Sequence, residues 1–122
     1  MKIFGIDDNA DITKLLDTVL NSMGHEYTFV NNGRDGVKSI RTNSYDMVLL
    51  DLSMPDFSGL DVIADLQSDG QITKQKIVLF TASSVSDREI QDMLSKGVHS
   101  CIRKPVDIDI LLDKLSEIEN PN

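Results

Sequence analysis

The sequence predicts an α/β domain with a doubly wound parallel sheet of five strands and helices on both faces. Short runs rich in Ile, Val, Leu and Phe alternate with longer segments whose apolar residues recur at helical spacing. The runs are apolar at nearly every position, which is typical of parallel strands covered on both faces. With 122 residues and 40% hydrophobic content, the chain can form one core and is too small for two.

The first strand is expected at residues 2–6 because this segment is almost entirely apolar and is followed by two acids. The apolar residues from 12 to 23 fall on one helical stripe, and Gly24 after them is typical of a helix C-terminus. A second strand is expected at 25–30. The Asn and Gly residues at 31–33 then predict a turn.

The middle of the chain repeats the same alternation. A weaker helical pattern ends near Asn43, and the apolar run 45–50 predicts a third strand that ends at Asp51. Apolar residues at 60–66 then give a short helix, and the run 77–80 gives a fourth strand.

The last part supplies one more strand between two helices. Ser86 and Glu89 form a capping-box pattern, so a helix is expected to begin there and to end near Gly97. A fifth strand is expected at 100–103. Asp107 is the expected N-cap of a final helix whose apolar stripe reaches Ile118.

We expect one domain over residues 1–118, a short frayed tail at 119–122 and no effector domain. The chain has 20 Asp and Glu against 12 Lys and Arg, and its net charge of -8 disfavours direct binding to nucleic acid or to acidic membranes. Its partners are therefore expected to be proteins. Since the sequence shows neither a membrane span nor a signal peptide, and its single cysteine, Cys101, has no internal partner, a cytoplasmic location is expected.

Functional side chains follow four of the predicted strands. Right-handed crossovers place the carboxyl ends of parallel strands at one edge of the sheet, where ligands of such folds bind. At this edge we expect Asp7, Asp8, Asp51, Thr81 and Lys104. The second strand contributes nothing comparable, which indicates that it lies at the margin of the sheet.

The chemistry expected at this edge follows from charge. Two carboxylates about 4 Å apart repel by roughly 4 kcal/mol at an effective dielectric near 20, so three clustered acids would have to protonate, separate or bind a cation. Oxygen ligands without His or Cys favour Mg²⁺, which also leaves room for a phosphoryl oxygen. Lys104 and the Thr81 hydroxyl are available for further phosphoryl oxygens. Asp51 is the expected nucleophile of phosphoryl transfer, which would give an acyl phosphate.

The ordered set of motifs resembles the receiver domain of two-component response regulators, closest in size to the stand-alone chemotaxis CheY type. The set comprises Asp7-Asp8, Asp51-Leu52-Ser53-Met54-Pro55 with Gly59, Thr81-Ala82 and Lys104-Pro105. The resemblance implies sheet order 2-1-3-4-5. It also implies a signalling switch, not an enzyme with turnover beyond its own phosphorylation and dephosphorylation. Its Asp51 would accept a phosphoryl group from a histidine kinase or a histidine phosphotransfer protein, and the domain would then bind a downstream protein target.

The resemblance also implies individual roles. Asp8 and Asp51 correspond to direct Mg²⁺ ligands, Asp7 to a ligand acting largely through water, and Ser53 to the residue whose backbone carbonyl binds the ion. Thr81 corresponds to the switch hydroxyl and Lys104 to the phosphate-pairing lysine. A cis peptide between Lys104 and Pro105 is implied as well.

Cys101 departs from the family pattern, because receivers usually have Tyr or Phe three residues before the lysine. Taken alone, it is expected to be a small buried apolar residue. Signal passage would then depend on backbone shifts after Thr81 and on repacking of the predicted helix from Ser86 and the predicted strand at 100–103.

The sequence is also compatible with two other functions. The first is a receiver-like binding module that works without phosphorylation, for which Cys101 is the only hint. The second is an enzyme of flavodoxin-like fold that uses a nucleotide, a flavin or a phosphoester. The loop Asp7-Asp8-Asn9-Ala10 argues against the enzyme, because it lacks glycines and presents acids where a phosphate would need backbone donors.

Overall fold

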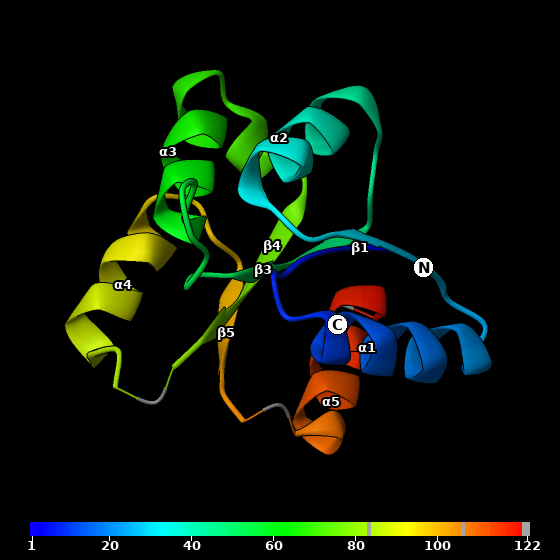
Figure 1. Cartoon of the computed structure of the whole chain (residues 1–122). Helices are drawn as coiled ribbons and strands as arrows, with labels where there is room; N and C mark the ends of the chain where they lie inside the picture. Colours follow the sequence, from blue (N-terminus) through cyan, green and yellow to red (C-terminus); the bar gives the residue numbers. More distant parts are fainter. Residues whose placement is uncertain (83, 106, 121–122) are drawn as a thin grey trace.

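The computed structural model describes residues 1–82, 84–105 and 107–120. Strands and helices alternate through these residues (Figure 1). The elements are β1 (Lys2–Ile6), α1 (Ala10–Ser22), β2 (Glu26–Val30), α2 (Gly33–Thr42), β3 (Met47–Asp51), α3 (Gly59–Ser68), the short 3-10 helix η1 (Gln71–Thr73), β4 (Lys76–Thr81), α4 (Asp87–Ser95), β5 (Ser100–Arg103) and α5 (Ile108–Glu119).

The strands form a parallel sheet in the order β2-β1-β3-β4-β5. Helices α1 and α5 cover one face of this sheet, and α2, α3 and α4 cover the other (Figure 1). The predicted fold class, the strand order and the marginal position of the second strand are confirmed. The central strand β3 is buried at all five positions, which accounts for its apolar sequence.

Strand alternation assigns each side chain of β1 to one of the two faces. Ile3 packs in the core beneath α1 and α5, whereas Phe4 and Ile6 pack beneath α2 and α3. Gly5 faces the same side as Ile3, and by the same alternation so does Asp7, which directly follows the strand. The Asp7 side chain therefore lies at the carboxyl edge of the sheet, on the side covered by α1 and α5.

Several element boundaries differ from the sequence predictions because side chains cap the ends. Helix α2 begins at Gly33, which was assigned to a turn, since the Asn32 side chain accepts a hydrogen bond from the Asp35 amide at 2.8 Å. Strand β3 begins two residues later than predicted, at Met47. Tyr45 instead stacks on Phe4, with ring centroids 4.6 Å apart.

The helix caps show a similar mixture of agreement and difference. Asp107 caps α5 as predicted, and Ser86 accepts from the Glu89 amide at 3.1 Å at the start of α4. A full capping box, which the sequence analysis did not anticipate, joins Ser58 and Asp61 at the start of α3.

The end of the chain is only partly described. Glu119, which was assigned to the frayed tail, is the last residue of α5, and the Asn120 amide donates to the Ser116 carbonyl at 2.9 Å. Residues 121–122 lie outside the described residues.

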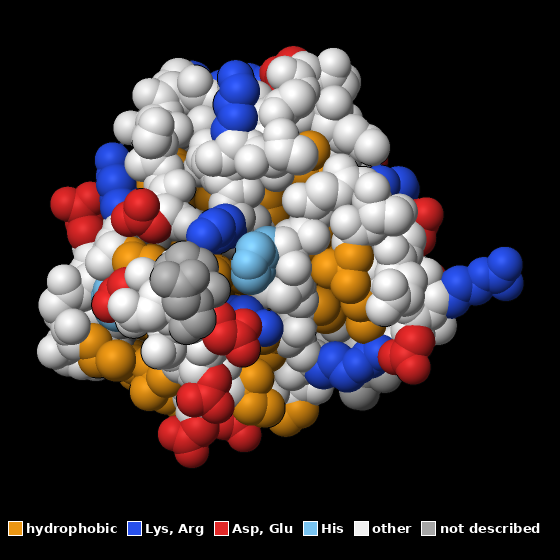
Figure 2. Space-filling view, turned by 180° about the vertical axis from the view of Figure 1, so that it is seen from behind, with side chains coloured by type: hydrophobic (Ala, Val, Ile, Leu, Met, Phe, Trp, Pro, Cys, Tyr) orange, Lys and Arg blue, Asp and Glu red, His pale blue; other side chains and the backbone are white. Residues whose placement is uncertain are grey.

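The described surface carries both signs of charge. On the face shown in Figure 2, acidic and basic side chains are interspersed with small hydrophobic areas instead of forming one broad basic area. No helix among the described residues has the length and apolar content needed to cross a membrane.

Candidate phosphoryl and metal site

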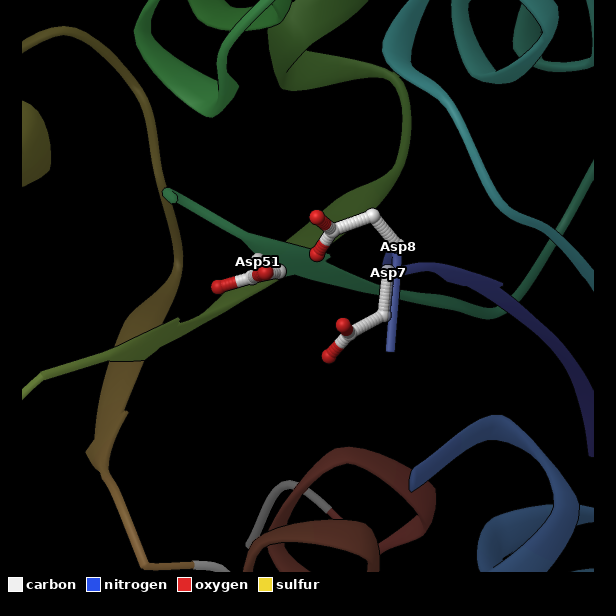
Figure 3. A group of neighbouring side chains, drawn as sticks. All are labelled: Asp7, Asp8 and Asp51. Atoms are coloured by element: carbon white, nitrogen blue, oxygen red, sulfur yellow. The ribbon is translucent and has the colours of Figure 1, made fainter. Parts of the chain in front are cut away.

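Three carboxylates meet at the carboxyl edge of the sheet. Asp7 and Asp8 follow β1, Asp51 ends β3, and one carboxylate oxygen from each lies within 4.8 Å of the others (Figure 3). Asp7 and Asp51 are only 3% and 2% exposed, whereas Asp8 is exposed. The cluster predicted from the strand ends is therefore present, with two buried acids and one at the surface.

Hydrogen bonds between strand ends hold these acids in place. Ile6 of β1 is paired with Leu50 of β3, so the residues that follow them emerge side by side. The Asp7 amide donates to the Val30 carbonyl at 3.2 Å, and the Asn31 side-chain amide donates to the Asp7 carbonyl at 2.8 Å. The Asp7 backbone is thus tied to the last residue of β2 and to the residue that follows it.

Gly59 packs directly against the backbone of Asp51, the candidate phosphoryl acceptor. A Cβ atom at this position would be 2.6 Å from the Asp51 carbonyl oxygen and 2.6 Å from the Leu52 Cα. The Gly59 amide also donates to the Leu52 carbonyl at 3.1 Å. The loop can turn this closely after β3 only because residue 59 has no side chain.

Asp51 has one charged and one neutral donor. Lys104 Nζ lies 3.0 Å from Asp51 Oδ1, and the Ser53 amide donates to the same oxygen at 3.2 Å. The Lys104 side chain is 26% exposed, so its ammonium reaches both the buried carboxylate and solvent. Lys104 can therefore neutralise Asp51 and still contact a group that arrives from outside.

The surroundings of Asp7 raise the pKa of its carboxyl group. Its pKa is raised from 3.8 to about 6, mainly by burial and in addition by the negative charge of Asp51. Two effects oppose this rise: the Asn9 amide donates to Asp7 Oδ1 at 2.9 Å, and Lys104 Nζ lies 3.9 Å from Asp7 Oδ2. A cation placed between Asp7 and Asp51 would remove their repulsion.

The donor set fits Mg²⁺. It consists of carboxylate oxygens from Asp7, Asp8 and Asp51, with the Ser53 backbone beside them. The oxygen Asp7 Oδ2 is buried and has no hydrogen-bond partner among the described residues, which is unusual for a carboxylate unless it serves a ligand. Oxygen-only ligands from a few carboxylates are what Mg²⁺ takes in proteins.

Thr81 and Lys104 are brought together at the ends of β4 and β5. Thr81 is fully buried, and its carbonyl accepts from the Lys104 amide at 2.6 Å. The Lys104–Pro105 peptide is cis, as the resemblance implied. Since Phe80 pairs with Asp51, the Thr81 backbone emerges next to the end of β3.

Cys101 was expected to be a small buried apolar residue, and the structure places it partly exposed on β5. Its Sγ lies 3.4 Å from Thr81 Oγ1. The thiol thus lies directly against the hydroxyl that the resemblance identifies with switching. The apolar neighbours of Cys101 belong to the core under α4.

Sequence reasoning missed three residues around Asp7. Asn9 and Asn31 fix its side chain and backbone, and Tyr27 places a hydroxyl on the same side of the sheet. Asn9 had a usable signal, because an Asn before a helical stripe is a strong N-cap. The contribution of Tyr27 depends on cross-strand register, which a single sequence does not reveal.

Comparison with known proteins gives a family match over almost the whole chain. The family described as response regulator receiver domain matches residues 3–116. The sensor histidine kinase RcsC of Salmonella typhimurium is 31% identical over 116 residues, which cover 95% of this chain and 12% of that protein. The transcriptional regulatory protein DltR of Streptococcus agalactiae is 30% identical over 115 residues, which cover 94% of this chain and 50% of that protein. The chain therefore spans half or less of the length of these relatives.

Solved structures share the same fold. The receiver domain of Francisella response regulator 1452 superimposes with a TM-score of 0.88 at 22% identity, covering 98% of this chain and 97% of that one. The response regulator protein TrrA of Thermotoga maritima, solved in complex with Mg²⁺-BeF, has a TM-score of 0.78 at 28% identity. This match covers 96% of this chain and 97% of that one.

Proposed function

This chain belongs to the response regulator receiver domain family, and on that premise we propose that it is a phosphoacceptor switch. Asp51 takes a phosphoryl group from a phosphohistidine protein, with Mg²⁺ bound by the acidic cluster. The observation that carries this proposal is the surroundings of Asp51: a carboxylate 2% exposed, 3.0 Å from a lysine ammonium and beside two further acids. A solvated surface aspartate would have none of these features.

The proposed transfer is a displacement at phosphorus. A carboxylate oxygen of Asp51 attacks, a new oxygen–phosphorus bond forms, and the phosphorus–nitrogen bond of the phosphohistidine breaks. The electron pair of the broken bond returns to the imidazole. The product is an acyl phosphate on Asp51, so no oxidant, reductant or further reactant is required.

The acidic cluster is the proposed metal site. Asp8 and Asp51 would hold Mg²⁺ directly, Asp7 through water, and Ser53 through its backbone carbonyl. The bound ion supplies charge neutralisation for the three acids and for the incoming phosphoryl oxygens. The TrrA complex with Mg²⁺-BeF supports this assignment, because that protein is similar to this chain over 96% of its length.

Lys104 and Thr81 are the proposed phosphate contacts of the chain itself. Lys104 already lies 3.0 Å from Asp51 Oδ1, so a small movement would carry its ammonium onto a phosphoryl oxygen. The Thr81 hydroxyl, at the end of the neighbouring strand, would take a second oxygen. Each such charge-assisted hydrogen bond contributes roughly 1.5–3 kcal/mol, so two approach the ~5.5 kcal/mol needed to reverse a two-state population.

The switch would act on the face formed by α4, β5 and α5. Thr81 can report on the phosphoryl group to this face because its Oγ1 contacts Cys101 Sγ on β5 at 3.4 Å. A histidine kinase or a histidine phosphotransfer protein is the proposed donor, and a downstream protein is the proposed target. We propose that residues 1–118 constitute the receiver unit of this signalling step.

Intact mass after treatment with acetyl phosphate and Mg²⁺ tests the proposal. We expect one added phosphoryl group on the parent chain, none on Asp51→Asn, and an unchanged adduct on Asp56→Asn. Asp56 is a suitable matched control, since it is an exposed loop acid with φ of 65°, a conformation that asparagine adopts readily. A parent chain that stays unmodified under conditions preserving acyl phosphates would favour a binding module that works without phosphorylation.

A further inference from the structure

Gly5 and Tyr27 form a complementary pair on the α1 and α5 side of the sheet. Tyr27 of β2 is paired with Ile3 of β1, and its ring extends along the sheet until the hydroxyl lies over Gly5. A Cβ atom at residue 5 would clash with that hydroxyl oxygen. The missing side chain at residue 5 therefore admits the Tyr27 hydroxyl to a position just below the acidic cluster.

The Tyr27 hydroxyl is a polar group in apolar surroundings. Tyr27 is 5% exposed and packs with Leu16 and Leu20 of α1, and its hydroxyl has no hydrogen-bond partner among the described residues. An unpaired buried hydroxyl is destabilising by about 1–3 kcal/mol, so a phenylalanine would pack equally well at lower free energy. A hydroxyl at this buried position is therefore expected to have a hydrogen-bond partner.

A candidate partner on the same side of the sheet is Asp7 Oδ2, which also has no hydrogen-bond partner among the described residues. Asp7 lies two residues beyond Gly5 on the same side of the sheet, a separation of about 6.6 Å along a strand. Figure 3 shows its side chain extending from the end of β1 toward the side where α1 and α5 lie. Burial raises the pKa of the Tyr27 hydroxyl, and the charges of Asp7 and Asp17 raise it further, as expected if both carboxylates lie close.

We propose that Tyr27 is a positioning residue for Asp7, its hydroxyl joined to Asp7 Oδ2 by one buried water molecule. Such a bridge spans up to about 5.6 Å between the two oxygens and pairs two buried polar atoms at once. Together with the Asn9 amide on Oδ1, it would fix both oxygens of the Asp7 carboxylate. Groups that orient metal ligands in this way typically change metal affinity by roughly 10- to 100-fold when removed.

This inference deepens the proposed function, because it concerns the orientation of one acid in the proposed Mg²⁺ pocket. The competing acceptor is Asp17 of α1, whose Oδ1 already accepts from the Asn21 side-chain amide at 2.6 Å. A hydroxyl bonded to Asp17 would only stabilise the fold. A hydroxyl bridged to Asp7 would also tune the binding of metal.

The first test is a crystal structure of the metal-free parent at a resolution that shows ordered water. We expect one water within hydrogen-bond distance of both Tyr27 Oη and Asp7 Oδ2. A hydroxyl paired with Asp17, or no water between Tyr27 and Asp7, would overturn the inference. This measurement needs no metal binding and no variant, so it decides the point even if the proposed function is wrong.

The second test compares the Mg²⁺ affinities of two matched variants. Binding is measured from the change in the amide NMR signal of Asn9 as Mg²⁺ is added. Tyr27→Phe removes one oxygen beneath the pocket, and Tyr45→Phe removes one oxygen from the other tyrosine of the chain, which stacks on Phe4. We expect roughly tenfold weaker Mg²⁺ binding for Tyr27→Phe, at the lower end of that range, and parental affinity for Tyr45→Phe. A folded Tyr27→Phe protein with parental affinity would refute a positioning role, whereas a parent that binds no Mg²⁺ would refute the proposed function.

Discussion

The charge on Asp7 should make the metal-free protein less stable as pH rises, and Asp7→Asn should remove this effect. Burial and the neighbouring Asp51 raise the Asp7 pKa from 3.8 to about 6 in the folded state. Below pH 4 the group is protonated in both folded and unfolded chains, so it adds no pH dependence there. Between pH 4 and 6 the folded protein keeps a proton that the unfolded chain releases, and the free energy of unfolding falls.

The size of the effect follows from the difference in pKa. One pKa unit corresponds to about 1.4 kcal/mol, so the difference between 3.8 and about 6 amounts to about 3 kcal/mol above pH 6. Asparagine removes the charge and keeps an oxygen for the Asn9 amide, but it loses the attraction of Lys104. We therefore expect Asp7→Asn to be more stable than the parent by about 1–2 kcal/mol at pH 7.5, and by little at pH 4.

Urea unfolding in the presence of a chelator measures this difference directly. Asp113→Asn serves as the control, because it removes one exposed acid of α5 and reports the effect of net charge alone. Adding Mg²⁺ should stabilise the parent and should have a smaller effect on Asp7→Asn. If the difference between parent and Asp7→Asn is the same at pH 4 and pH 7.5, Asp7 does not carry the burial and repulsion described here.

Three further substitutions probe the neighbouring groups. Gly5→Ala should lower the free energy of unfolding by about 1–3 kcal/mol because the new methyl group meets the Tyr27 hydroxyl. Tyr27→Phe in the same chain removes that oxygen and keeps the ring, so it should restore part of the loss; no loss in Gly5→Ala would contradict the packing. Lys104→Met should slow phosphoryl uptake from acetyl phosphate at least about tenfold, since one charge-assisted contact is lost. A parental rate of uptake, measured by intact mass, would exclude Lys104 as a phosphate contact. Thr81→Ala should remain phosphorylatable but should lose the amide NMR shift changes that phosphorylation causes over α4, β5 and α5 in the parent. Thr81→Ser, which keeps the hydroxyl, should retain these shift changes. Equal shift maps for Thr81→Ala and the parent would show that the hydroxyl does not couple the pocket to this face.

The fold and the main site residues could be predicted from the sequence because they depend on order along the chain. Apolar runs mark parallel strands, and the residue after each run falls at the same edge whatever the details of packing. Asp51 and Lys104 are 53 residues apart in sequence and form an ion pair at 3.0 Å for that reason. The approximate positions of the helices followed from the same periodicity.

Features that depend on side-chain contacts across elements could not be predicted. The start of α2 at Gly33 rests on the Asn32 cap, and the later start of β3 on the stacking of Tyr45 against Phe4. The contact of Cys101 with Thr81 requires the register of β4 and β5, in which Leu79 pairs with Cys101. The Gly5 and Tyr27 pair likewise appears only when β1 and β2 are aligned.

Asp51, and no other acid of the cluster, is the proposed acceptor of the phosphoryl group. Borohydride reduces an aspartyl phosphate to homoserine, so treating the phosphorylated chain with borohydride and sequencing its peptides by mass spectrometry identifies the acceptor. Homoserine at position 51 in the parent, and at no position in Asp51→Asn, is the predicted result. Homoserine at position 7 or 8, or a phosphoryl group on a histidine that borohydride leaves intact, would contradict the account.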